Sequence, residues 1–205
     1  SMLELQAPDA LKVLPILHPA AILRAWYNRD VTIHDLSARV PLALAGDWRP
    51  SPAPNIVHMP TFADATGILS DWHDQLKRGN VLRLSHDIET ARGVITCMAF
   101  ADGPFSAGAN ALVIPLVRPQ PGGAFENYWS AAEEQTVSRL MVDVWSHPNV
   151  RIEGQNYNYD TQWIEACYGS RPRLDFDTML AHHLLWPGTP KALDYIASLY
   201  NHYYW

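Results

Sequence analysis

Cysteine, basic residues and long apolar runs are all scarce in this chain of 205 residues. Its two cysteines, Cys97 and Cys167, are too few for a disulfide framework or a cysteine-rich zinc site, and they are typical of a reducing compartment. Lys and Arg number 15 against 21 Asp and Glu, and the net charge of −6 argues against a protein that coats nucleic acid through bulk electrostatics. No apolar run approaches the roughly 18 residues of a membrane span. We therefore expect a cytoplasmic protein with no membrane partner.

What the chain does contain is enough for a globular core, because 48% of its residues are apolar and only 18% are charged. The segment 46–60 is rich in proline, which fixes φ and pushes the preceding residue toward extended conformations, so we predict a linker there. Residues 1–45 are too few to count as a domain, whereas 61–205 carry a continuous globular pattern. Ser1 and Met2 resemble an expression scar, and we expect the chain to be a piece of a longer protein.

Apolar periodicity predicts an α/β fold over residues 61–205. Thr61 and Asp64 match a capping box, which starts a predicted helix that ends at Gly79. Alternating and helical apolar patterns then follow one another along the chain. We predict strands at 81–88, 94–101, 111–117 and 150–154, and helices at 130–145, from 159 onward, at 177–186 and at 191–200. Hairpins followed by a crossover indicate a mixed sheet flanked by helices.

Asp87 and Glu89 are the first candidate site residues. They lie two positions apart at the end of an apolar strand, and the strand's period of two puts both on one face. Two carboxylates so close raise each other's pKa unless something positive lies between them. A hard divalent cation bound by oxygens is the usual remedy. The alternative is a polar strand end with solvated acids.

A third candidate carboxylate follows the fourth predicted strand. That strand ends at Gly154, amides follow at Gln155 and Asn156, and Asp160 arrives at the start of the next helix. If this strand neighbours the strand that carries Asp87, the two motifs come together. The alternative is a loop with Asn turns and an Asp helix cap.

Taken together and in this order, three segments resemble the 3′–5′ exonuclease domain of family A DNA polymerases. They are Asp-Ile-Glu-Thr at 87–90, Gly-Gln-Asn-x-x-Tyr-Asp at 154–160 and Phe-Asp-Thr-Met-Leu at 176–180. The resemblance covers roughly residues 80–200. It implies a ribonuclease H-like fold of the DnaQ-like 3′–5′ exonuclease type.

The resemblance also implies a site with two Mg²⁺ or Mn²⁺ ions, in which Asp87, Glu89 and Asp160 are the catalytic and metal-binding residues. Asp87 would bridge both cations, Glu89 would hold the ion that generates hydroxide, and Asp160 would help to hold the other. Thr90 and Asn156 would bind the terminal nucleotide. The implied partners are the 3′ end of single-stranded DNA and a DNA polymerase domain in the parent chain, in the cytoplasm of a bacterial or phage-infected cell.

The sequence departs from that family at the third motif, Tyr-x-x-x-Asp. No Tyr here has an Asp four positions on; Tyr200, for example, is followed there by Tyr204. Asp175, Asp177 and Asp194 fall at positions that are not metal ligands in the family. We therefore expect an exonuclease domain truncated at its C-terminus. The alternative is a catalytically inactive module that serves DNA binding or scaffolding in a polymerase or DNA-repair fusion protein.

Two further features bear on nucleic acid. Residues 13–24, with His18 and Pro19 at their centre, resemble the C-terminal His-Pro motif of uracil-DNA glycosylases, but the family's water-activating and uracil-binding motifs are missing. We predict that His18 is an ordinary helix start, because a segment this short cannot enclose a flipped base. A glycosylase function would require upstream sequence. Tyr157 and Tyr159 flank the second motif and are candidates for stacking on a base.

Overall fold

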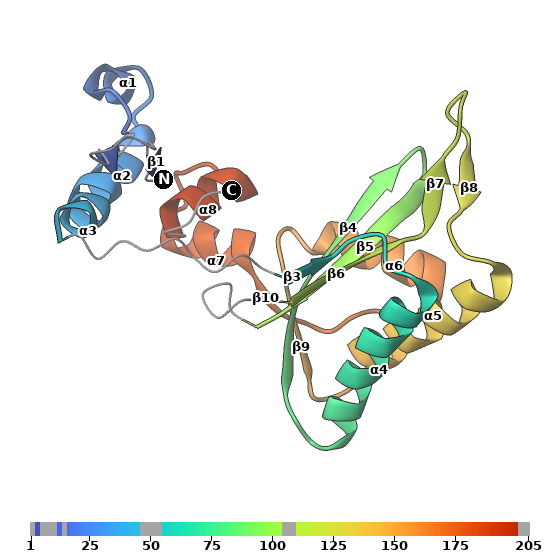
Figure 1. Cartoon of the computed structure of the whole chain (residues 1–205). Coiled ribbons are helices and arrows are strands. Elements are labelled where there is room, and N and C mark those ends of the chain that lie inside the picture. The colour runs from blue at the N-terminus through green and yellow to red at the C-terminus, as the bar shows by residue number, and fades with distance from the viewer. Residues whose placement is uncertain (1–2, 5–11, 14–15, 46–54, 104–109, 201–205) are drawn as a thin grey trace. The chain divides into compact units, whose positions relative to one another are not determined.

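The computed structural model describes residues 3–4, 12–13, 16–45, 55–103 and 110–200 (Figure 1). The chain forms two compact units, one comprising Pro52–Thr178 and the other Ser1–Ser51 with Met179–Trp205. Most of the predicted linker, residues 46–54, lies outside the described residues. Within its described part, Asn55–Val57 forms a short strand. The predicted boundaries at 1–45, 46–60 and 61–205 stay predictions.

The larger unit is built on a mixed six-stranded sheet with the order β10-β9-β4-β5-β6-β3. Its strands are β3 (Asn55–Val57), β4 (Leu82–Ala91), β5 (Val94–Asp102), β6 (Asn110–Pro115), β9 (Val150–Gly154) and β10 (Leu174–Asp177). Strands β4, β5 and β6 are antiparallel neighbours, whereas β9 runs parallel to both β4 and β10, and β3 runs parallel to β6. A short hairpin of β7 (Val117–Pro119) and β8 (Phe125–Asn127) follows β6. The prediction of a mixed sheet is confirmed.

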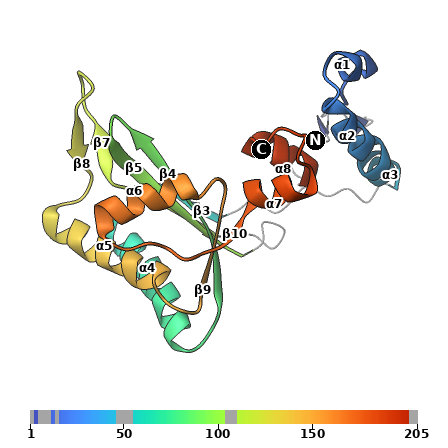
Figure 2. The same cartoon turned by 180° about the vertical axis from the view of Figure 1, so that it is seen from behind.

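Three helices pack against one face of this sheet. They are α4 (Phe62–Lys77), α5 (Ala131–Trp145) and α6 (Asn158–Tyr168), seen from two sides in Figures 1 and 2. The predicted capping box of Thr61 and Asp64 starts α4, and Ser130 with Glu133 forms another at α5. Phe100 of β5 joins the layers, because its ring contacts Trp72 of α4 and Trp145 of α5.

Strand β4 shows why one face is apolar and the other is charged. Its residues alternate between buried and exposed from Leu82 to Glu89, as expected for a strand with one covered face. The buried set contains Leu82, Leu84, His86 and Ile88. The exposed set contains Arg83, Ser85, Asp87 and Glu89. The sequence prediction that Asp87 and Glu89 share a face is therefore confirmed.

The smaller unit contains segments from both ends of the chain. Its described elements are β1 (Leu3–Glu4), β2 (Lys12–Val13), α1 (Pro19–Arg24), α2 (Asn28–His34), a π-helical segment at Asp35–Arg39, α3 (Val40–Ala45), α7 (Thr178–Leu185) and α8 (Leu193–Tyr200). The half-buried Arg39 guanidinium pairs with Asp35 at 2.9 Å and donates to the Ser198 carbonyl. His18 caps α1 by accepting the Ala20 amide at 3.1 Å, which confirms the helix-start prediction. Across the described part of the chain, every helix is too short or too polar to cross a membrane.

Candidate functional site

Asp87 and Glu89 project from the exposed face of β4, close to its end. They lie opposite Ala99 and Cys97 of β5, so the neighbouring strand brings no positive charge next to them. Neighbouring groups partly desolvate the Asp87 carboxylate, and this raises its pKa; the charge of Glu89 raises it further. The ionised form of Asp87 is therefore less favourable here than it would be for a freely solvated carboxylate.

The second motif begins where β9 ends and forms a tight loop before α6. Asn156 has φ 53°, in the left-handed region that Asn tolerates better than most residues. Asp177, at the end of β10, accepts the amides of Asn156 at 3.2 Å and of Tyr157 at 2.9 Å. Gly154 lies directly against the Tyr157 ring, because a Cβ added there would lie 2.5 Å from Cδ2. The loop after β9 and the start of α6 are therefore held in place by the packing of Tyr157 on Gly154 and by the buried carboxylate of Asp177.

Asp160 reaches the first motif through the main chain of β4. Pairing of β4 with β9 extends to Ser85, which lies opposite Glu153, and β4 continues beyond that point. Beyond it, the Ile88 amide donates to Asp160 Oδ1 at 3.1 Å. Two segments 72 residues apart in sequence thus meet at the amide between Asp87 and Glu89.

The Asp160 carboxylate is buried and lies within electrostatic reach of two other acids, Asp87 and Asp177. Asp160 is 3% exposed, and burial raises its pKa to about 6; the charges of Asp87 and Asp177 act in the same direction. The Ile88 hydrogen bond opposes that shift but does not cancel it. In the described part of the chain, no Lys or Arg forms an ion pair with Asp87, Glu89 or Asp160.

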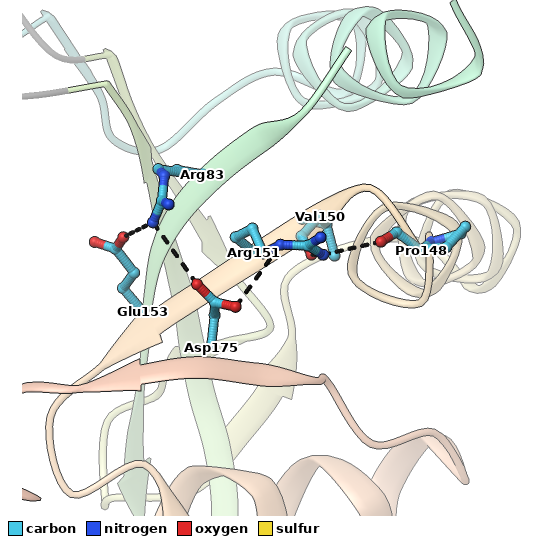
Figure 3. Close-up of polar contacts among 6 residues, drawn as sticks. All are labelled: Arg83, Pro148, Val150, Arg151, Glu153 and Asp175. Atoms are coloured by element: carbon cyan, nitrogen blue, oxygen red, sulfur yellow. Dashed lines mark hydrogen bonds and ion pairs between the residues drawn. The ribbon is translucent and has the colours of Figure 1, made fainter. Parts of the chain in front are cut away.

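A different arrangement occupies the other end of the same face (Figure 3). Arg83 of β4 contacts Glu153 of β9 at 2.9 Å and Asp175 of β10 at 3.7 Å. Arg151 of β9 contacts Asp175 at 3.7 Å and also donates to the Pro148 carbonyl at 3.0 Å. We call these four charged residues the ion-pair ladder. It links three neighbouring strands on the face that carries Asp87.

The donor chemistry and the geometry give different answers about a metal ion. Uncompensated carboxylates are the ligands that Mg²⁺ and Mn²⁺ prefer. However, no group of three His, Cys, Asp or Glu side chains is gathered closely enough to hold an ion anywhere in the described ranges. Asp87 and Asp160 therefore fit a hard cation in kind, but Glu89 does not complete a three-ligand centre with them. The metal-binding and catalytic roles of these residues stay predictions.

The predicted substrate residues flank this site. The Thr90 hydroxyl shares a hydrogen bond with the Tyr159 hydroxyl at 2.6 Å, which connects the end of β4 to α6. Asn156 lies exposed in the loop before α6, and its role in binding substrate stays a prediction. Tyr159 is 47% exposed and can still offer its ring to a base. Tyr157 is 0% exposed, so its predicted role in stacking is wrong: its ring lies in the core.

Sequence reasoning missed two residues that organise this site. Asp177 lies at a position that is not a metal ligand in the resembling family, yet it holds the loop and adds its charge to the surroundings of Asp160. His86 is 3% exposed and contacts Tyr157 through its Nδ1 atom. The sequence signal that could indicate His86 is a histidine at a core-facing position of the strand that also carries Asp87 and Glu89.

Comparisons with known proteins agree with this geometry at the level of the fold. No protein-family model and no curated protein sequence matches the chain. Among solved structures, it is similar to the catalytic core of RRP6 from Trypanosoma brucei, with a TM-score of 0.50 and 13% identity over 74% of this chain and 36% of that one. A mutant of that core matches with a TM-score of 0.48 and 13% identity over 93% and 46% of the two chains. RNase D of Escherichia coli, an exoribonuclease involved in structured RNA processing, matches with a TM-score of 0.37 and 12% identity over 68% and 30%.

The chain thus spans less than half the length of each of these structures. The likeness to the RRP6 core, together with the mixed sheet, establishes a ribonuclease H-like fold. That confirms the predicted fold class. The narrower resemblances to family A DNA polymerases and to uracil-DNA glycosylases stay predictions.

Proposed function

We propose that this chain is a nuclease domain that removes nucleotides from the 3′ end of single-stranded nucleic acid with the help of Mg²⁺ or Mn²⁺. The observation that carries the proposal is the Ile88 hydrogen bond to Asp160, because it joins the two carboxylate motifs at one point. Acids that are crowded and carry raised pKa values without a neighbouring cation are typical of functional sites. The ribonuclease H-like fold is compatible with this activity.

In this proposal, each residue has a separate task. Asp87, Glu89 and Asp160 would bind the cations, which, when bound, supply an activated water and neutralise charge on the phosphate. Thr90 and Asn156 would hold the terminal nucleotide, and the exposed ring of Tyr159 lies next to Thr90 for contact with a base. From the motif resemblance we propose single-stranded DNA as the substrate and a polymerase domain as the partner.

A second candidate is a binding module that keeps the fold without catalysis. The observation that favours it is the missing three-ligand group within the described residues. Such a module would use the same carboxylate site with a single cation, or none, and would retain contacts to phosphate and bases. Binding without cleavage would be its signature.

The decisive experiment follows 5′-labelled single-stranded DNA and RNA oligonucleotides with Mn²⁺, with Mg²⁺ and with chelator. We expect slow shortening from the 3′ end of DNA that requires metal, because two carboxylates converge but the third does not complete the group. Asp87→Asn should abolish it. Asp175→Asn is the matched control, since it removes an acid of the ion-pair ladder on the same face, and it should retain activity.

The outcomes separate the candidates. Faster shortening of RNA than of DNA would replace the proposed substrate. Metal-dependent binding without shortening would favour the binding module. Neither binding nor shortening, or equal shortening by the wild type and Asp87→Asn, would contradict the proposed site.

A further inference from the structure

A histidine and a tyrosine form a polar pair inside an otherwise apolar core. His86 is 3% exposed, and its ring stacks on Phe100 with centroids 4.3 Å apart. Its Nδ1 atom lies within hydrogen-bond distance of the Tyr157 hydroxyl. Its Nε2 atom is buried and has no hydrogen-bond partner among the described residues. Burial lowers the pKa of His86 to about 3, so the imidazole is neutral.

Apolar side chains at these two positions would stabilise the core more than the His86–Tyr157 pair does. A buried polar atom without a partner destabilises the folded state, and replacing both partners by apolar groups of similar shape is close to neutral or stabilising. Phe100, Trp145 and Tyr157 already surround the imidazole with rings. A leucine in place of His86 would suit that environment better. Polar groups that lower stability in this way are kept mainly at functional sites.

The pair instead fixes the start of α6 against β4. Tyr157 and Asp160 are three positions apart, so they project from the same side of the first helical turn. The Tyr157 side chain contacts His86, and the Asp160 carboxylate accepts the Ile88 amide. The first turn of α6 is therefore held at two points, two residues apart on β4. Gly154 allows the Tyr157 ring to lie there, since any larger residue would collide with it.

We infer that the hydrogen bond between His86 and Tyr157 is a positioning contact that holds the Asp160 carboxylate at the Ile88 amide, beside Asp87. The inference rests on the proposed function for its biological purpose. The geometric claim stands on its own contacts. His86 touches none of the reacting groups in this account and acts through Tyr157.

The test compares variants in the intact chain by NMR. The backbone amide signal of Ile88 and its hydrogen-exchange rate report directly on the bond to Asp160. In the double variant His86→Leu/Tyr157→Phe, both polar partners are gone, so we expect an unchanged or higher melting temperature. We also expect the Ile88 amide to exchange about tenfold faster than in the wild type or more.

Two further variants keep the result interpretable. His86→Asn places an amide near the position of Nδ1, can still bond the Tyr157 hydroxyl, and should restore slow exchange at Ile88. Ile114→Val perturbs the same core on β6, two strands from His86 in the sheet, and should leave Ile88 exchange unchanged relative to global stability.

Equal protection of Ile88 in the wild type and the double variant would overturn the inference, as would faster exchange that His86→Asn does not reverse. If Ile88 responds as expected but the wild type neither binds Mn²⁺ nor cleaves oligonucleotides, the proposed function fails while the positioning contact stands. If the chain cleaves DNA while Ile88 stays protected in the double variant, the function stands and the positioning contact fails.

Discussion

Acidic side chains at the two ends of the exposed face of β4 differ in whether a basic side chain pairs with them. At the Arg83 end, Glu153 and Asp175 meet guanidinium groups in the ion-pair ladder. At the Asp87 end, Asp87 lies beside Glu89 on β4 and beside Asp160 of α6, no cation pairs with these acids among the described residues, and the pKa values of Asp87 and Asp160 rise. The first arrangement balances charge within the fold. The second leaves negative charge that the described residues do not neutralise, which is the expected property of a site that binds a cation.

The largest expected effect tests this contrast with matched acids. Asp87→Asn should weaken Mn²⁺ binding at least about a hundredfold, because loss of a ligand exceeds the 10–100-fold effect of losing an outer partner. Asp175→Asn removes one negative charge from the ladder and should leave Mn²⁺ affinity nearly unchanged. Calorimetric titration of Mn²⁺ into both variants at pH 7.5 measures the difference. Equal losses in the two variants would mean that Mn²⁺ senses only overall charge.

The next effect concerns pH. The pKa of Asp160 is raised to about 6 by burial, whereas its value in the unfolded chain is about 3.9. The folded chain therefore holds this proton more tightly, and the stability contributed by protonation is present below about pH 4 and lost as pH rises through about 6. Asp160→Asn should raise the free energy of unfolding at pH 7.5 by about 1–2 kcal/mol, after allowance for solvent screening.

Urea unfolding of wild type and Asp160→Asn at pH 4 and pH 7.5 checks that sign. The gain should vanish at pH 4, where the wild-type carboxyl group is already neutral. The amide oxygen of Asn can still accept the Ile88 hydrogen bond, so the comparison isolates the charge. If Asp160→Asn is less stable than wild type at pH 7.5, the claim that the ionised Asp160 carboxylate destabilises the folded chain is wrong.

The smallest effect belongs to the ladder. Arg83→Gln breaks two ion pairs on an exposed surface, and we expect a loss of less than about 1 kcal/mol in the free energy of unfolding. The loss should shrink in 0.5 M salt, because exposed pairs are screened. Denaturant unfolding at two salt concentrations measures both. A loss that is larger and independent of salt would show that the ladder is not an ordinary surface network.

The sequence predicted the architecture well where periodicity was strong. Capping at Thr61, the alternation of β4 and the helix at 130–145 all have local causes, and each is found. Strands such as β3 and β10 were missed, because each is short and is defined by a partner distant in sequence. A run of three or four residues has too little pattern of its own to indicate a strand.

The candidate site was predictable only in part. Residue types and strand parity indicated Asp87 and Glu89, and motif order indicated Asp160. The contact that joins them passes through the main-chain amide of Ile88, which no side-chain pattern can indicate. Likewise, the burial of Tyr157 follows from its packing on Gly154 and His86 across two strands, so its interpretation as a stacking residue failed.

The most direct test of the central claim is the position of Mn²⁺ in crystals of this chain soaked at pH 7.5, located by its anomalous scattering. The account predicts a peak in contact with the carboxylates of Asp87 and Asp160, and none in crystals of the Asp87→Asn variant. A peak at Glu153 or Asp175 instead, or no peak near Asp87 at saturating Mn²⁺, would contradict it.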